Sequence, residues 1–224
     1  LTFEASSAGN KPGGLVLWGN PTIEPSEARP VRGQPNIIVI LIDALRPDHL
    51  GVYGYERPTS PNLDEFAKES IVFENAFAQA QCTHVSVASL FTSLFPLEAK
   101  EKATGYYNLK EDPLTLAERL EAAGYANAAF STNHLVHWDY AFDQGFDTFF
   151  CHHMLPCRPL KDTVLEWLKN NSRRPFFLYL HYMDVHSPYE PPRMFRSRFV
   201  SPDYEPTSAA IRSGNPVLVR HEMA

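Results

Sequence analysis

Polar and ionisable side chains follow each of the strongly apolar runs in this sequence. They are Asp43 after the run at 37–42, Thr132, Asn133 and His134 after the run at 125–130, and His181, Asp184 and His186 after the run at 175–180. If these runs are parallel strands of one sheet, their carboxyl ends lie at the same edge and the polar side chains converge there. A carboxylate, imidazoles and a hydroxyl in one place are suited to metal binding and to general acid–base chemistry. Taken singly, each has an ordinary alternative, such as a surface position for His134 or a turn at His186.

A second group of candidate residues lies in the segment QCTHVSVASLFTSLFP, at 81–96. Thr83 falls at or near the predicted start of a helix, and Ser86 lies one turn later. The free amide groups and the dipole of a helix start favour an anionic ligand. A threonine hydroxyl attacks poorly unless its proton is removed or a metal ion stabilises the alkoxide, and Asp43 could hold such an ion. The alternative is that Thr83 or Ser86 simply caps the helix, which is the commoner role for that position.

The elements that must position these residues alternate between strands and helices. Uninterrupted apolar runs predict buried strands at 37–42, 125–130 and 175–180, and a further short extended segment is expected at 71–77. Apolar periodicity and turn residues predict helices that open at Ser60 and Pro61, lead from 79–81 to Pro96, run from Pro113 to Gly124, and span about 160–170. This alternation is typical of an α/β fold with a doubly wound, mostly parallel sheet flanked by helices.

Composition and charge narrow the class of protein. The chain has 224 residues, 44% hydrophobic and 21% charged, which suits one α/β domain with a sizeable core. Its net charge is -6 without a basic block, which argues against nucleic-acid binding. No apolar run approaches the roughly 20 residues that span a bilayer. Because the chain starts at Leu1 and stops at Ala224 in mid-pattern, we expect a fragment and predict no compartment.

The cysteines give no zinc-binding spacing. Cys82 stands apart, whereas Cys151 and Cys157 lie close together around His152 and His153. A local disulfide between Cys151 and Cys157 is one alternative, and a pair of reduced loop cysteines is the other.

Five stretches, in this order along the chain, resemble the sulfatase branch of the alkaline phosphatase superfamily. They are NIIVILIDALRPDHLGVYGY, TSPNLDEFAKESIVFENAFAQ, SLFTSLFP, AFSTNHL and PFFLYLHYMDVHSPY. The resemblance implies an incomplete alkaline phosphatase/sulfatase-like fold, a large sheet sandwiched by helices. It makes residues 35–224 the N-terminal portion of a sulfatase-like catalytic domain. Independently of the resemblance, a short strand candidate at 15–18 and Pro- and Glu-containing sequence at 24–34 predict that residues 1–34 are the end of a preceding β-rich module plus a linker.

The resemblance also implies which residues hold a metal ion and attack the ester. Asp43 takes the place of the first metal-binding aspartate, while Ala44 stands where many members have a second. Thr83 takes the place of the nucleophile, which also contacts the metal. In classical sulfatases that residue is a Cys or Ser converted to formylglycine. Cys82 is one residue early and lacks the Pro and Arg of that motif, so formylglycine is not expected here.

Further residues match positions that bind or protonate the ester. His134 resembles the histidine that contacts the ester, and His186 the later active-site histidine, so both are candidate catalytic and substrate-binding residues. Ser86 and Arg46 are also expected to bind substrate, with a structural role as the alternative for Arg46.

The resulting hypothesis is a metal-dependent hydrolase of sulfate or phosphate esters that forms a covalent intermediate on Thr83. The expected cation is Ca²⁺ or Mg²⁺, with Zn²⁺ or Mn²⁺ as alternatives, and the expected partner is a sulfated or phosphorylated small molecule or glycan. The alternatives are a phosphoethanolamine or phosphoglycerol transferase, a phosphodiesterase, or a non-catalytic pseudo-enzyme on the same fold. We expect residues 1–224 alone to be inactive.

Overall fold

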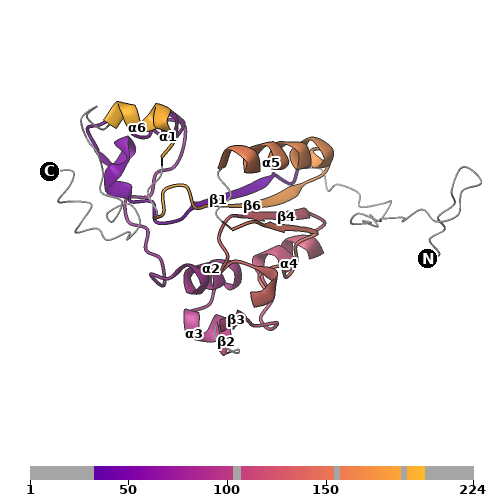
Figure 1. The fold of residues 1–224 in the computed structure, drawn as a ribbon. Helices are drawn as coiled ribbons and strands as arrows, with labels where there is room; N and C mark the ends of the chain where they lie inside the picture. The colour runs from indigo at the N-terminus through magenta and orange to yellow at the C-terminus, as the bar shows by residue number, and fades with distance from the viewer. Residues whose placement is uncertain (1–32, 103–106, 154–156, 188–190, 200–224) are drawn as a thin grey trace, which may run out of the picture.

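A four-stranded parallel sheet forms the centre of the computed structural model, which describes residues 33–102, 107–153, 157–187 and 191–199 (Figure 1). The strand order is β1–β6–β4–β5. The strands are β1 (Ile37–Ile42), β4 (Ala126–Ser131), β5 (Thr148–Cys151) and β6 (Phe176–Tyr182). The predicted α/β class with a parallel sheet is therefore confirmed, and so are strands at the three predicted places. β4 and β6 are buried as predicted, whereas β1 is only partly buried.

The register of the central strands brings their carboxyl ends level with one another. Ile42 pairs with Tyr182, and His181 pairs with Ser131 on its other side. The pairing with β6 continues one step beyond β1, because the backbone amide of Asp43 donates to the carbonyl of Tyr182 at 2.9 Å. The residues that follow β1 and β4 and the last residues of β6 are thus held at one edge of the sheet.

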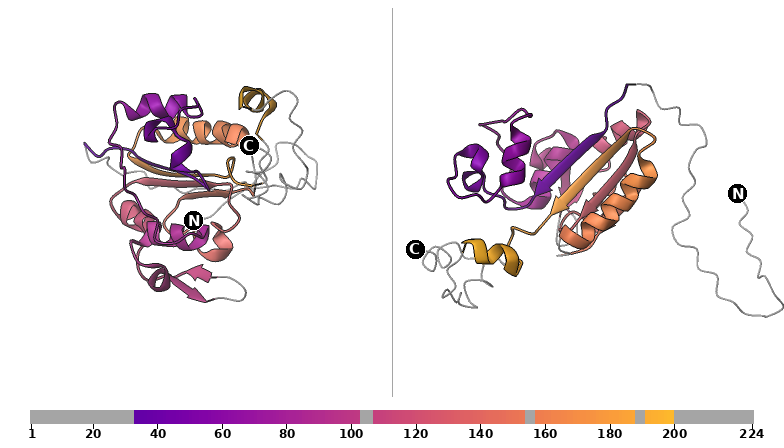
Figure 2. Two further views of the ribbon diagram at one scale, coloured as in Figure 1. Left: turned by 90° about the vertical axis from the view of Figure 1, so that its left-hand side faces the viewer. Right: turned by 90° about the horizontal axis from the view of Figure 1, so that it is seen from above.

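Helices cover both faces of this sheet. α5 (Cys157–Asn171) lies on one face, and α2 (Thr83–Thr92) and α4 (Leu116–Ala122) lie on the other (Figure 1). Beyond the carboxyl ends of the strands lie α1 (Pro61–Ala67) and α6 (Arg193–Phe199) (Figure 2). The smaller elements are the 3-10 turns at Pro47–His49, Gly51–Tyr53 and Trp138–Tyr140, α3 (Pro96–Ala99), and the antiparallel pair β2 (Lys100–Lys102) and β3 (Tyr107–Leu109).

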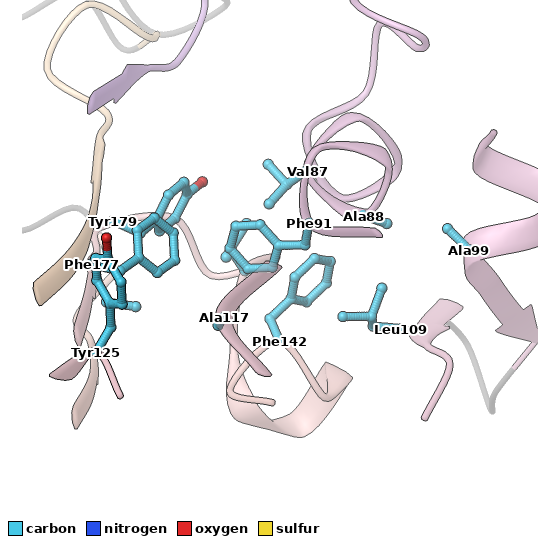
Figure 3. Close-up of a cluster of buried hydrophobic side chains, with 12 residues drawn as sticks. Val87, Ala88, Phe91, Ala99, Leu109, Ala117, Tyr125, Phe142, Phe177 and Tyr179 are labelled. Atoms are coloured by element: carbon cyan, nitrogen blue, oxygen red, sulfur yellow. The ribbon is translucent and has the colours of Figure 1, made fainter. Parts of the chain in front are cut away.

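Two hydrophobic clusters fix the helices on the sheet, because side chains along β6 alternate between its faces. Phe177 and Tyr179 join the cluster under α2 and α4, whereas Leu178 and its alternate neighbours join the cluster under α5. Phe91 of α2 packs edge-on against Tyr179, with ring centroids 4.9 Å apart (Figure 3). This contact docks the helix that begins at Thr83 onto the strand that carries His181.

β1 has a different environment from its neighbours. Within the described residues it pairs with β6 alone, so one of its edges carries no partner strand. Ile38 and Ile40 on this strand are half-exposed, at 50% and 60%. The side chains that alternate with them, including Val39, pack into the cluster under α2.

The structure corrects one of the predicted helix starts and confirms the one at Ser60 and Pro61. The helix expected from Pro113 begins at Leu116, because Thr115 is its N-cap and accepts a hydrogen bond from the amide of Glu118 at 3.1 Å. α1 begins at Pro61 with Ser60 at the N-cap position, but the Ser60 hydroxyl makes no capping bond and donates instead to the Asp64 carboxylate at 3.0 Å. The predicted helix start at Thr83 is confirmed, as is the helix at 160–170, which extends to 157–171.

Other differences concern short or exposed segments. The extended segment expected at 71–77 is not a strand, and Ile71 is 84% exposed. β5 was not among the predicted strands. All three cysteines are free, which agrees with the reduced alternative. No helix in the described part of the chain has the length and apolarity to cross a membrane. The expected module and linker at 1–34 fall almost entirely outside the described residues.

Candidate active site

Asp43 lies at the centre of a polar cluster at the carboxyl edge of the sheet. Its side chain is 13% exposed, and its Oδ2 atom accepts hydrogen bonds from three other segments. The donors are Thr83 Oγ1 at 3.0 Å, Asn133 Nδ2 at 2.7 Å and His181 Nε2 at 3.1 Å. The convergence expected from the sequence is therefore present for the ends of β1, β4 and β6 and for the start of α2.

Thr83 reaches Asp43 because it is the first residue of α2. The N-cap is Cys82, which makes no side-chain capping bond, and the amide of Ser86 closes the first turn on the Cys82 carbonyl at 3.0 Å. The Thr83 hydroxyl is directed at the carboxylate of Asp43 instead of its own helix. The alternative in which Thr83 merely caps the helix is therefore wrong.

His181 and Tyr179 form a buried extension of the cluster. Both side chains are fully buried, and the Tyr179 hydroxyl lies 2.9 Å from His181 Nδ1. Burial and the negative charge of Asp43 raise the pKa of Tyr179 well above its usual value, so the phenol keeps its proton and can donate it. His181 then accepts at Nδ1 and donates from Nε2 to Asp43.

Asn133 holds Asp43 from the β4 side. It is 2% exposed, and its Oδ1 accepts from the amide of Leu135 at 2.8 Å while its Nδ2 donates to Asp43. Both ends of the amide are engaged, so its orientation is fixed. Asn133 therefore presents N–H groups, and not its oxygen, to the centre of the cluster.

The cluster keeps Asp43 ionised. Burial raises the pKa of Asp43, but the hydrogen bonds from His181, Thr83 and Asn133 outweigh that effect, so the pKa lies below its usual value. At neutral pH the site consequently contains a carboxylate that faces the Thr83 hydroxyl.

The other candidate site residues lie outside this hydrogen-bonded cluster. His134 packs edge-on against His153, with ring centroids 4.6 Å apart. His186 Nδ1 lies 2.7 Å from the Ser187 carbonyl. Ser86 lies in the first turn of α2. Arg46 Nε donates to Asp48 at 3.0 Å, an exposed pair in the turn after β1. The structure thus joins Asp43 to Thr83 and leaves these four as candidate residues without a contact of their own to Asp43 in the described part.

Sequence reasoning gave no role to several residues of the cluster. Asn133 and His181 were expected at the sheet edge, but Tyr179 was not expected near the site at all.

Lys100, at the start of β2, is a further buried polar residue that the sequence did not indicate. It is 6% exposed and lies near Cys82. Burial lowers the pKa of Lys100 to about 8, against the raising effect of Cys82. No local pattern links Lys100 to the start of α2, because tertiary packing alone makes them neighbours.

The fold defines the class of protein. The parallel sheet with helices on both faces matches solved proteins of alkaline phosphatase-like fold. One of these, solved in complex with its substrate D-glucosamine-2-N,6-O-disulfate, aligns with a TM-score of 0.63 at 22% identity over 79% of this chain and 42% of that chain. The phosphonate monoester hydrolase of Agrobacterium radiobacter aligns with a TM-score of 0.63 at 18% identity over 75% of this chain and 44% of that chain.

The sequence comparisons name the family. The sequence model of the family Sulfatase matches residues 35–156, and the chain belongs to this family. The arylsulfatase of Clostridium perfringens is 33% identical over 107 residues, covering 46% of this chain and 21% of that protein. Human N-acetylgalactosamine-6-sulfatase is 28% identical over 136 residues, covering 53% of this chain and 26% of that protein. The chain therefore spans about a quarter or less of the curated relatives it matches.

Sulfatases generally use a metal ion, and the donors in the cluster are suited to a hard cation. Asp43 and Thr83 offer oxygen atoms, which Ca²⁺ and Mg²⁺ prefer, whereas Asn133 and His181 present N–H groups that cannot bind a cation. Within the described ranges, no three His, Cys, Asp or Glu side chains are grouped to hold a metal ion. The described residues thus fit part of an oxygen-rich donor set.

Proposed function

We propose that the protein containing this chain hydrolyses sulfate esters of small molecules or glycans, with Thr83 as the nucleophile. The observation that carries the proposal is the 3.0 Å contact between Thr83 Oγ1 and Asp43 Oδ2 at the carboxyl edge of the sheet. A threonine at the start of a helix, facing a buried carboxylate, is placed for attack on an anionic ester. The family assignment supports the reaction class.

In this proposal Thr83 attacks the sulfur in line with the leaving oxygen. Thr83 gives its hydroxyl proton to water as the new bond joins its Oγ1 to sulfur. The bond from sulfur to the alcohol oxygen breaks, and that oxygen takes up a proton from the protonated form of His134 or His186. Water then hydrolyses the ester on Thr83 and releases sulfate. Ser86 and Arg46 are proposed to bind the ester oxygens.

Asp43 and Thr83 would hold the divalent cation through their oxygen atoms. A bound cation supplies charge that lowers the pKa of the Thr83 hydroxyl and offsets charge on the ester oxygens. We propose Ca²⁺ or Mg²⁺ because both donors are hard oxygens, with Zn²⁺ or Mn²⁺ as the alternatives that metal analysis would test. The remaining donors would come from other parts of the full-length protein or from water.

A sulfated sugar is the proposed substrate class. Relatives include N-acetylgalactosamine-6-sulfatases, and one structural neighbour was solved with a disulfated glucosamine as its substrate. Phosphate, phosphodiester or phosphonate esters are the second candidate class. The similarity to a phosphonate monoester hydrolase and the presence of Thr83 where classical sulfatases carry a modified cysteine or serine both favour testing it.

The test uses the full-length protein and both ester classes. We expect Thr83→Ala to lower kcat on its best aryl sulfate or phosphodiester by on the order of 10³-fold, because the attacking oxygen is lost. Thr83→Ser should keep measurable turnover, since it retains the hydroxyl. Thr163→Ala, an exposed threonine on α5, is the matched control and should leave kcat unchanged.

Three outcomes separate the alternatives. Full turnover by Thr83→Ala would refute Thr83 as the nucleophile. Turnover that releases no free sulfate or phosphate, but moves the group onto an added alcohol or glycan, would favour a transferase. A full-length protein that binds no divalent cation and turns over neither ester class would be a pseudo-enzyme.

A further inference from the structure

Tyr179 and His181 form a buried chain of hydrogen bonds that ends on the carboxylate of Asp43. The two residues are alternate positions of β6, so their side chains lie on the same face of the sheet. Tyr179 OH lies 2.9 Å from His181 Nδ1, and His181 Nε2 lies 3.1 Å from Asp43 Oδ2. Both side chains are fully buried, so water cannot replace either partner.

The direction of the protons in this chain follows from the chemistry of its ends. Asp43 is an ionised carboxylate and can only accept, so His181 must carry a proton on Nε2. The neutral imidazole then has a lone pair on Nδ1, which accepts the hydroxyl proton of Tyr179. Tyr179 therefore selects the tautomer of His181 that can donate to Asp43.

The hydrogen bonds to Asp43 are distributed unequally between its two oxygens. Oδ2 accepts from Thr83, Asn133 and His181, whereas no donor from the described part of the chain reaches Oδ1. A carboxylate held on one oxygen by two fixed N–H donors cannot rotate freely. Its orientation toward Thr83 is thereby set before any ligand binds, which reduces the entropy lost on binding.

We propose that His181, with its tautomer set by Tyr179, is a positioning residue that holds Asp43 in the orientation in which it and Thr83 bind a divalent cation. The inference rests on the proposed function for the identity of the ligand, but it concerns the arrangement of the protein's own side chains. Neither residue touches the ester in this role. Partners of this kind behind a ligating side chain typically change metal affinity by about 10–100-fold when they are removed.

The decisive variant is Tyr179→Phe in the full-length protein. It removes a single hydroxyl from a ring that otherwise keeps its packing against Phe91. Without that donor, His181 Nδ1 is left buried and unpaired, or the proton moves to Nδ1 and a lone pair faces the carboxylate. We expect the dissociation constant for Ca²⁺ or Mg²⁺, measured by titration calorimetry with each metal, to rise about 10–100-fold.

Tyr125→Phe is the matched control. Tyr125 belongs to the same hydrophobic cluster and also loses one hydrogen bond, from its hydroxyl to the Pro35 carbonyl at 3.1 Å, but it does not contact His181. We expect this variant to keep the cation dissociation constant within about twofold, whatever it costs in stability.

A second readout is independent of both metal and turnover. Nitrogen chemical shifts of the imidazole of His181 distinguish Nε2–H from Nδ1–H, and we expect the Nε2–H form in the wild type and loss of that signature in Tyr179→Phe. If Tyr179→Phe does not fold, His181→Gln and His181→Ala provide the comparison. The glutamine retains an N–H donor and should preserve more cation affinity than the alanine.

The outcomes separate this inference from the proposed function. Unchanged cation affinity and an unchanged tautomer in Tyr179→Phe would overturn it, and so would a wild-type protein that binds no divalent cation. Weakened affinity in Tyr179→Phe but not in Tyr125→Phe would support it, even if the wild type hydrolyses no ester and the hydrolase proposal fails.

Discussion

The Thr83 hydroxyl lies 3.0 Å from a carboxylate oxygen of Asp43, although 40 positions separate the two residues in the sequence. Each lies at the end of an element: Asp43 is the first residue after β1, and Thr83 is the first residue of α2. Phe91 anchors α2 on β6, so the contact is fixed by the packing of the core and not by a flexible loop. A pair held in this way is available for chemistry without rearrangement of the backbone.

Asp43→Asn should weaken cation binding by at least about 100-fold in the full-length protein, because a neutral amide replaces the one carboxylate of the cluster. Titration calorimetry with Ca²⁺ and Mg²⁺ measures the effect. Asp162→Asn, which alters an exposed carboxylate on α5, is the control and should bind as the wild type does. Equal affinities in the two variants would remove Asp43 from the metal site.

Cys82 should remain an unmodified cysteine. The structure makes it the N-cap of α2, one residue before the hydroxyl that faces Asp43. Mass spectrometry of the peptide containing residues 81–96 should give the mass of the encoded sequence, and Cys82→Ala should keep kcat within about twofold because the thiol makes no capping bond. Detection of an aldehyde at this position would reverse the assignment of Thr83.

His153→Gln should raise the pKa of His134 toward the ordinary histidine value of 6.5. Burial lowers the pKa of His134, and the adjacent His153 and His137 lower it further. The folded protein therefore favours neutral His134, and it should lose stability relative to the variant as the pH falls below 6.5. NMR titration of the His134 imidazole measures the shift directly. His152→Gln is the matched control and should leave the pKa of His134 where it is.

Gly145→Ala should destabilise the protein by roughly 2–4 kcal/mol. Gly145 has a positive φ of 79°, and an added Cβ would overlap the backbone of Ala117 and Glu118 in α4. Gly124 has a similar φ of 86° but nothing within 4 Å of the added carbon, so Gly124→Ala should cost about 1 kcal/mol through backbone strain alone. Denaturant unfolding of both variants measures the free energy of unfolding and so separates the clash from the strain. Equal losses of unfolding free energy would show that the neighbouring backbone moves to accommodate the added Cβ.

The sequence predicted β1, β4 and β6 and the convergence of their ends because both follow from local signals, although β1 proved to be buried on one face only. Continuous apolar runs indicate strands buried on two faces, and the parallel arrangement places the residues after them at one edge. Asp43 could be expected near Thr83 for this reason. The resemblance to sulfatases pointed to the same two residues from motif positions.

The remaining features depend on information that no local pattern contains. The hydrogen bond from His181 to Asp43 depends on the register of β6 against β1 and β4, and Tyr179 joins the site only because it alternates with His181 along that strand. β5 is four residues long and sits among aromatic residues that also suit a loop. Ile71 and its apolar neighbours suggested a strand, but they are exposed in the structure, where propensity alone does not create a pairing partner.

Within the described ranges, the edge of β1 that faces away from β6 has no partner strand, and this has a consequence for handling the protein. Free backbone amides and carbonyls beside the half-exposed Ile38 and Ile40 form a surface that can accept a strand from another molecule. A preparation of the 224-residue chain should therefore self-associate more as its concentration rises. Ile40→Lys, at a position that points away from the cluster beneath α2, should keep the chain monomeric at higher concentration.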